Sequence, residues 1–92
     1  MFGELIRKHR EKKKLPLRKV AASLDVDTSI LSKIERGERQ AVSGMIPILA
    51  KELDIDFKEL QINFLTNRII IEYGKEKFIN EALEQTEKEL KG

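Results

Sequence analysis

Five polar side chains between positions 28 and 36 are the residues of this chain best arranged for chemistry. At about 100° per residue of helix, they fall within an arc of about 140° on one face. They are Thr28, Ser29, Ser32, Lys33 and Arg36. Hydroxyl groups donate or accept hydrogen bonds, and ammonium and guanidinium groups donate them. Leu31 and Ile34 fall on the opposite side, so a narrow apolar strip can hold this helix down while its polar face is left to meet a partner.

The rest of the composition gives little support for a catalytic site or a metal site. The 92 residues include no cysteine and a single histidine, so thiolate zinc sites and histidine clusters are excluded. That histidine, His9, continues an apolar stripe formed by Phe2, Leu5 and Ile6, so we expect it to pack at the edge of a core. No patterned nucleophile or phosphate loop accompanies the many carboxylates. We therefore predict a small binding module that is not an enzyme and needs no cofactor.

The polar face needs a preceding element to position it, and the segment PLRKVAASL provides one. Leu17, Val20, Ala21 and Leu24 repeat at the spacing of one helical stripe. Pro16 can open this helix because its φ angle is fixed. Only a short turn then separates the two predicted helices.

The turn and the ends of the second helix are also marked in the sequence. Asp27 is a good N-cap, because its carboxylate can accept the first free backbone N–H groups, and Gly37 can adopt the left-handed conformation that ends a helix. Asp25 stands in the turn, where aspartate tolerates the left-handed region better than most residues. The pattern predicts two short helices joined by a tight turn.

Basic residues are concentrated in the first part of the chain. The net charge is +2 overall, but residues 1–40 carry 11 Lys or Arg against 6 Asp or Glu, whereas residues 41–92 carry 7 against 10. Eight of the basic residues lie between Arg7 and Lys19. Such a cluster is typical of a surface that meets phosphate groups, although a solvated lysine face would give the same composition.

Three segments together resemble the phage-repressor type of helix-turn-helix protein, the group of Cro proteins, lambda-type repressors and xenobiotic-response-element regulators. They are LIRKHR, VAASLDVDTSILSKIERG and MIPILAKELDID, and the resemblance covers roughly residues 5–60. It implies an all-α fold: a lambda-repressor-like five-helix DNA-binding domain with a C-terminal helical extension. Family members often have Gln where this chain has Leu17 and Gly where it has Asp25, so one phosphate contact and the usual turn residue differ here.

The resemblance also implies roles for individual side chains. The base contacts that it implies in the major groove are Thr28, Ser29, Ser32 and Lys33. Contacts to phosphates give affinity without sequence information. Those predicted here are Arg7, Lys12, Lys13, Arg18, Lys19, Arg36 and Arg39. Arg10 and Glu35 would form a structural ion pair between the first and third helices.

Helical patterns account for the rest of the chain. The first helix is expected over residues 2–13, and a fourth helix is expected after a Ser43 cap. The DxxE sequence at Asp56 is typical of a capping box, and the fifth helix that it starts can continue to Tyr73. A last helix is expected over residues 75–91, and no strand pattern or internal repeat interrupts the series.

The C-terminal tail contains more apolar residues than a five-helix core needs, and this surplus indicates a partner. We predict a DNA-binding domain over residues 1–65 and a helical dimerisation element over residues 66–92. The predicted interface residues are Phe64, Leu65, Ile69, Ile70, Tyr73, Phe78, Ile79 and Leu83. The alternative left open by the sequence is that the tail folds back on its own domain.

These features predict a sequence-specific regulator that binds double-stranded DNA as a homodimer, with residues 28–36 in the major groove of a palindromic operator. It would repress nearby promoters or regulate its own gene, and control of restriction and modification genes is one alternative. A competing interpretation is an antitoxin or adaptor that mainly holds another protein, such as a toxin or part of the transcription machinery. The start of the chain lacks a secretory apolar core, so we expect a cytoplasmic protein with no membrane partner.

Overall fold

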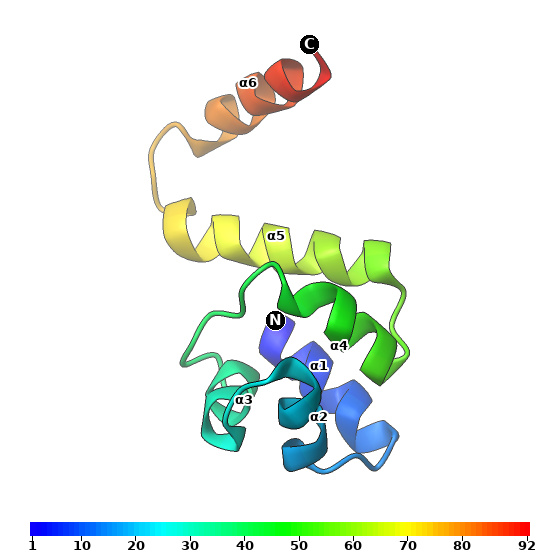
Figure 1. The fold of residues 1–92 in the computed structure, drawn as a ribbon. Coiled ribbons are helices and arrows are strands. Elements are labelled where there is room, and N and C mark those ends of the chain that lie inside the picture. Colours follow the sequence, from blue (N-terminus) through cyan, green and yellow to red (C-terminus); the bar gives the residue numbers. More distant parts are fainter.

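The computed structural model describes residues 1–92 as six α-helices with no strand. The helices are α1 (Phe2–Lys12), α2 (Leu17–Leu24), α3 (Thr28–Glu35), α4 (Met45–Leu53), α5 (Phe57–Tyr73) and α6 (Ile79–Lys91). Figure 1 shows the first five gathered into one body, with α2 and α3 remote from α6, which stands apart beyond α5. The predicted all-α fold class is confirmed.

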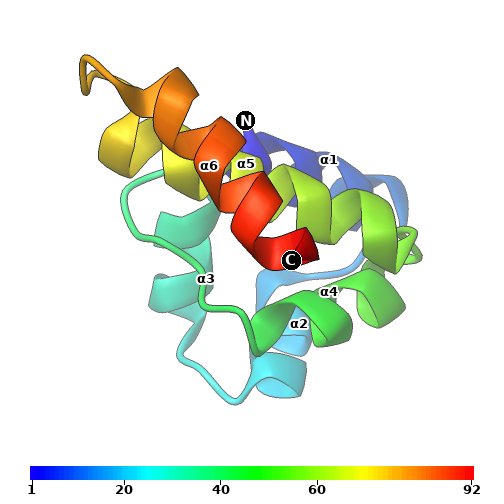
Figure 2. The same cartoon turned by 90° about the horizontal axis from the view of Figure 1, so that it is seen from above.

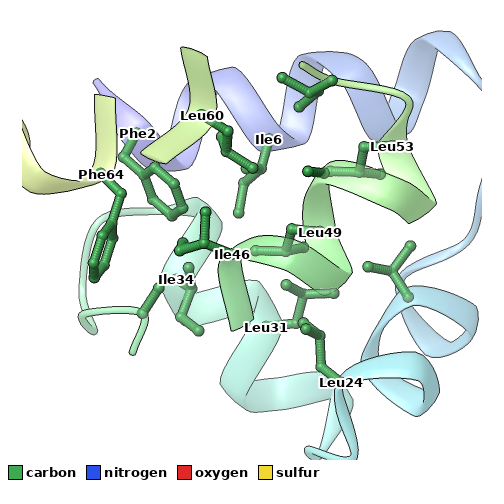
Figure 3. Close-up of a cluster of buried hydrophobic side chains, with 14 of the residues drawn as sticks. Phe2, Ile6, Leu24, Leu31, Ile34, Ile46, Leu49, Leu53, Leu60 and Phe64 are labelled. Atoms are coloured by element: carbon green, nitrogen blue, oxygen red, sulfur yellow. The ribbon is translucent and has the colours of Figure 1, made fainter. Parts of the chain in front are cut away.

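A cluster of fifteen buried apolar side chains holds this body together. All five helices from α1 to α5 contribute to it, and Figure 3 shows side chains of α1, α3, α4 and α5 meeting at its centre. Ile6, Leu31, Leu49 and Leu60 are completely buried, and full burial of such a side chain contributes about 1.5–3 kcal/mol. The last member of the cluster along the chain is Phe64. The core is therefore complete without the second half of α5 and without α6.

Several predicted helix ends are confirmed. Asp25 takes the left-handed conformation after α2, with φ 57°, and Gly37 does so after α3, with φ 77°. The Asp56 carboxylate accepts a hydrogen bond of 3.0 Å from the backbone N–H of Glu59, which caps α5. Helix α5 then continues to Tyr73 without a break, so it passes through the predicted boundary at residue 65.

Two predicted side-chain caps are wrong. Asp27 is the N-cap residue of α3, but only its backbone carbonyl accepts the first N–H groups, from Ile30 and Leu31. The N-cap of α4 is Gly44 and not Ser43. The chain already turns before α4, because the Met45 N–H donates to the Val42 carbonyl at 2.9 Å, so the backbone satisfies the donors that a serine hydroxyl would cap.

The predicted limits of two helices also need correction. Helix α1 ends at Lys12, one residue before the predicted end. Helix α6 begins at Ile79, four residues after the predicted start, because residues 75–78 form a turn in which the Glu76 N–H donates to the Tyr73 carbonyl at 3.0 Å. None of the six helices is both long enough and apolar enough to cross a membrane.

Helix α6 does not pack onto the five-helix body. No residue of α6 is buried, and the substantial helix-to-helix contacts all lie among α1 to α5. In Figure 2 α6 overlaps the body in projection, and the perpendicular view in Figure 1 shows it standing apart from α5 and from the other helices. The exposure of α6 agrees with the prediction that the tail carries surplus apolar surface. It does not agree with the alternative that the tail folds back on its own domain.

Candidate nucleic-acid interface

A tight turn fixes α3 relative to α2. After α2, the Asp25 N–H donates to the Ala22 carbonyl at 3.1 Å, and the Val26 N–H donates to the Ala21 carbonyl at 3.0 Å. This pair of bonds is the Schellman arrangement, which needs a left-handed residue at the position that Asp25 occupies. The three residues between the helices therefore form a rigid corner, and α3 leaves it in a defined direction.

Helix α3 buries one side and exposes the other, as the sequence pattern predicts. Leu31 and Ile34 lie in the core. Of the four predicted base contacts, Thr28, Ser29 and Lys33 are exposed, whereas Ser32 is half-buried. A rigid helix thus presents a row of hydrogen-bonding side chains to the surroundings, which is the property required of a surface that reads another molecule.

The ion pair implied by the resemblance is present and is almost completely buried. Arg10 Nε donates to Glu35 Oε2 at 2.7 Å, and Arg10 Nη2 donates to Glu35 Oε1 at 3.0 Å. The two side chains are only 11% and 5% exposed. Arg10 Nη1 also donates to the Leu15 carbonyl at 2.8 Å. One guanidinium therefore joins α1, the loop after it and the end of α3.

The charge on Arg10 is secured by the same contact. The hydrogen bonds that Arg10 donates to the Glu35 carboxylate raise the pKa of Arg10 further above its already high ordinary value. Such a bidentate pair fixes orientation as well as distance, because the fork of N–H groups matches the two carboxylate oxygens. The pair therefore sets the angle at which α3 leaves the body.

A second attachment of α3 to α1 was not found from the sequence. Gly3 lies against the C-terminal end of α3, where an added Cβ would collide with the Ile34 carbonyl oxygen and would lie 2.6 Å from that of Glu35. Gly3 and Arg10 are seven residues apart and so share one face of α1. The available signal was a glycine inside a helical stripe, which often marks a close approach of two backbones.

The predicted phosphate contacts are all exposed. Lys12, Lys13, Arg18 and Lys19 surround the loop from α1 to α2, and Arg39 lies in the loop after α3. The structure brings the other two together. Arg7 and Arg36 line one hollow of about 260 Å³, which Leu17 and Ser32 also line. Leu17 offers no hydrogen bond there, and of the polar residues that line the hollow only Arg7 and Arg36 are exposed.

Arg36 donates hydrogen bonds to Ser32 and to Glu38, and Glu38 was not among the site residues predicted from the sequence. Its Nε donates to Glu38 Oε2 at 2.7 Å, and its Nη1 donates to Ser32 Oγ at 2.8 Å. The hydrogen bond from Arg36 lowers the pKa of Glu38. The signal available in the sequence was an acidic residue just after the glycine that ends α3.

A family model described as helix-turn-helix (HTH_3) matches residues 6–60, which include α2, the corner, α3 and the Arg10–Glu35 pair. The chain belongs to this helix-turn-helix family. The lambda-repressor-like fold follows, and the chain is a DNA-binding transcriptional regulator. Comparison with curated proteins and with solved structures gives no match.

The tail of this helix-turn-helix regulator carries most of the predicted interface residues on its surface. Leu65, Ile70, Tyr73, Phe78 and Leu83 are exposed, and Ile69 and Ile79 are half-buried. An apolar groove of about 540 Å³ lies between the end of α5 and α6. Ile62, Ile71 and Leu90 are also exposed, although they were not among the predicted interface residues.

Phe64 is a correction to the predicted interface. Its side chain is only 4% exposed and belongs to the core, where its ring packs edge-on against Phe2 with 5.6 Å between centroids. Helical periodicity explains why Phe64 is buried, because it lies four residues after the fully buried Leu60 and shares its inward face.

No group of three or more His, Asp or Glu side chains lies close enough together to hold a metal ion.

Proposed function

We propose that this regulator is a repressor or autoregulator that binds a palindromic operator as a homodimer, with α3 in the major groove. The observation that carries the proposal is the exposed polar face of α3, held by core residues on its other side and by the buried Arg10–Glu35 pair. A surface for reading bases must be positioned precisely, because hydrogen bonds to base edges tolerate little displacement.

Within this proposal, affinity and specificity come from different residues. The residues predicted to neutralise phosphates strengthen binding to any sequence; they are Arg7, Lys12, Lys13, Arg18, Lys19, Arg36 and Arg39. Those predicted to reach base edges are Thr28, Ser29, Ser32 and Lys33. The tail carries 5 Lys or Arg against 6 Asp or Glu and so has no net positive charge for phosphates, and in Figure 1 it lies on the far side of the body from α2 and α3.

The homodimer is proposed from the tail, residues 66–92, which extends the DNA-binding part at residues 1–65. An isolated helix of 13 residues is only marginally stable in water, so α6 needs a surface to pack on. The second copy of the chain offers one, because it exposes the same groove and the same apolar residues around Tyr73 and Phe78. A two-fold dimer would place two α3 helices one DNA turn apart, about 34 Å.

A footprint on the DNA upstream of the regulator's own gene tests the proposal. We expect protection of two half-sites whose centres are one helical turn apart, and loss of binding as salt rises, since counterions compete with the basic residues. A chain that binds all duplexes equally, or none, would contradict it.

The second candidate is an antitoxin or adaptor that mainly holds another protein, and the exposed apolar tail favours it to the same degree. An antitoxin would also bind DNA, so a gel shift alone does not separate the two. The deciding measurement is the oligomeric state of the purified chain. A dimer that binds its operator without any other protein supports the regulator, whereas a monomer that binds DNA tightly only with a second protein supports the antitoxin.

A further inference from the structure

Arg36 lies on the same row of the exposed helical face as two predicted base contacts. Thr28, Ser32 and Arg36 are four residues apart, so their side chains follow one another along the surface. Arg36 is the C-cap of α3 but retains helical angles, with φ −85° and ψ −2°. Its bond to Ser32 draws the guanidinium back by one turn, towards the N-terminal part of α3. In helix-turn-helix complexes that part of the recognition helix contacts base edges.

The existing bonds of Arg36 leave a defined set of donors free. A guanidinium has five N–H groups. The Nε–H and one Nη2–H face the Glu38 carboxylate, at 2.7 and 3.5 Å, and one Nη1–H donates to Ser32. One N–H remains on each terminal nitrogen. Two such donors on adjacent nitrogens suit the O6 and N7 acceptors that guanine presents in the major groove.

Glu38 makes Arg36 a poor ligand for a phosphate. Its carboxylate already holds the side of the guanidinium that a phosphate would take, and its negative charge repels a second anion. Guanine O6 and N7 are neutral acceptors, so the same carboxylate hardly opposes them while it restricts the rotation of the long arginine side chain. Arg7, on the other side of the hollow, donates to Glu11 only through its Nε, at 3.3 Å, so its terminal nitrogens remain for the phosphate.

We propose that Arg36 reads a guanine in each half-site, with Glu38 and Ser32 as the residues that position its guanidinium. This moves Arg36 from the phosphate contacts, where the sequence placed it, to the base contacts. It also gives Ser32 a second role, because its hydroxyl accepts a bond from Arg36 and need not touch a base itself. The inference rests on the proposed function, since it requires that α3 enters the major groove.

The test begins with the full chain and a pool of random duplexes, from which the preferred site is selected. Affinities are then measured on that site and on duplexes with each base pair changed. The variants are Arg36→Ala, Arg36→Lys and Glu38→Gln. Arg39→Ala is the matched control, because it removes the same charge from an exposed residue of the neighbouring loop. Circular dichroism shows whether each variant remains folded.

We expect Arg36→Ala to abolish the preference for guanine at one base pair of each half-site, a loss of roughly 5- to 150-fold in discrimination. The other positions should keep their preferences. Arg36→Lys should not restore the preference fully, because an ammonium lacks the planar fork. Glu38→Gln should weaken the same preference and should strengthen binding to unrelated DNA, since a negative charge is removed. Arg39→Ala should weaken binding to all duplexes alike.

Two results would overturn the inference while leaving the proposed function intact. If Arg36→Ala weakened binding to every duplex equally and lowered the salt slope by about 0.9, Arg36 would be a phosphate contact. If it left both affinity and preference unchanged, the Arg36–Glu38 pair would be a surface pair without a role in binding. Failure of the wild-type chain to select any site would instead refute the proposed function itself, and the inference with it.

Discussion

The five-helix body and the tail use the same kinds of apolar residue in opposite ways. In the body, fifteen apolar side chains are buried against one another, and the last of them is Phe64. Beyond it, Ile70, Tyr73 and Phe78 are more than half exposed. The body therefore satisfies its apolar residues within one chain, whereas the tail leaves them for a surface that the single chain does not provide.

The charged residues of the two regions differ in the same sense. The body contains one buried, bidentate pair, Arg10–Glu35, which joins residues far apart in the sequence. In the tail, the pairs Arg68–Glu72 and Lys91–Glu87 join neighbours one helical turn apart; the first is partly exposed and the second is largely exposed. Pairs of the second kind contribute only a few tenths of a kcal/mol to a helix. The buried pair of the body therefore holds two helices in a fixed arrangement, whereas each pair of the tail supports only the helix that contains it.

Removal of α6 should produce the largest effect and would test the difference directly. A chain cut after Tyr73 keeps every core residue, so we expect it to remain helical but to lose most of its dimerisation. Its affinity for a palindromic site should fall by about 10²- to 10⁴-fold, because the two half-sites would no longer be bound together. Sedimentation at micromolar concentration and a binding titration measure the two quantities.

Point variants distinguish a lost interface from a shortened chain. Phe78→Asp places a charge on the exposed tail, whereas Ile48→Asp places the same charge on an exposed apolar residue of α4. Only the first should make the chain monomeric. A full-length chain that is already monomeric, or a shortened one that dimerises equally well, would move the interface away from the tail.

Loss of the buried ion pair should have the next largest effect, this time on the body. Glu35→Ala leaves the buried Arg10 guanidinium without an opposite charge, which costs about 3–5 kcal/mol. The free energy of unfolding of a small domain is about 5–15 kcal/mol, so thermal and denaturant unfolding should detect the change easily. An unchanged melting temperature for Glu35→Ala would mean that the pair is dispensable.

Two further variants serve as controls for this measurement. Glu11→Ala removes the carboxylate of the exposed Arg7–Glu11 pair and should change the melting temperature little. The double variant Arg10→Met with Glu35→Leu removes both buried charges and should recover much of the lost stability. It should still weaken operator binding, because the bidentate contact no longer helps to fix the angle of α3.

The sequence predicted most of the fold because its signals are local. The apolar stripe ending at Leu24, the left-handed residues Asp25 and Gly37, and the Asp56 cap each act over a few residues and lie where predicted. The side-chain cap at Ser43 fails because the chain already turns there, and backbone carbonyls accept the Met45 and Ile46 N–H groups. At Asp27 the helix begins as predicted, but the carboxylate accepts no N–H group.

The candidate site was predicted less completely, because part of it depends on contacts between distant residues. The exposed face of α3 follows from helical periodicity alone. The contact of Gly3 with the end of α3 depends on how two helices cross, and the position of Glu38 beside Arg36 depends on the loop after Gly37. Phe64 was assigned to the interface because the sequence does not tell which apolar residues of a long helix the core takes up.

Enlarging Gly3 should have a moderate effect on the body and on DNA binding. In Gly3→Ala the new methyl group would collide with the carbonyl oxygens at the end of α3, and overpacking of this kind typically costs about 1–3 kcal/mol. We expect a lower melting temperature together with weaker operator binding, since relief of the clash must move α3 away from α1. Gly44→Ala is the control, because an added Cβ there meets no atom within 4 Å. Equal stability of the two variants would contradict the close approach.

The smallest expected effect concerns the exposed basic residues, where single changes should act on affinity alone. Lys19 is exposed on α2 and belongs to no ion pair of the chain, so Lys19→Ala should hardly change stability. If Lys19 meets a phosphate, the variant should bind every duplex more weakly by a similar factor. Its plot of log affinity against log salt should be less steep by about 0.9, because one fewer counterion-binding phosphate is neutralised.

Two variants at other positions show whether the loss at Lys19 reflects contact with DNA. Lys58→Ala removes an exposed lysine from α5 and should leave the salt slope unchanged, because Figure 1 shows α5 on the side of the body opposite α2 and α3. Lys33→Ala, on the exposed face of α3, should instead alter which base is preferred, because a lysine can donate to guanine O6 or N7. If Lys19→Ala changed the base preference, Lys19 would be a base contact and its assignment to a phosphate would be wrong. If Lys58→Ala lowered the slope equally, the losses would reflect only the total charge of the chain.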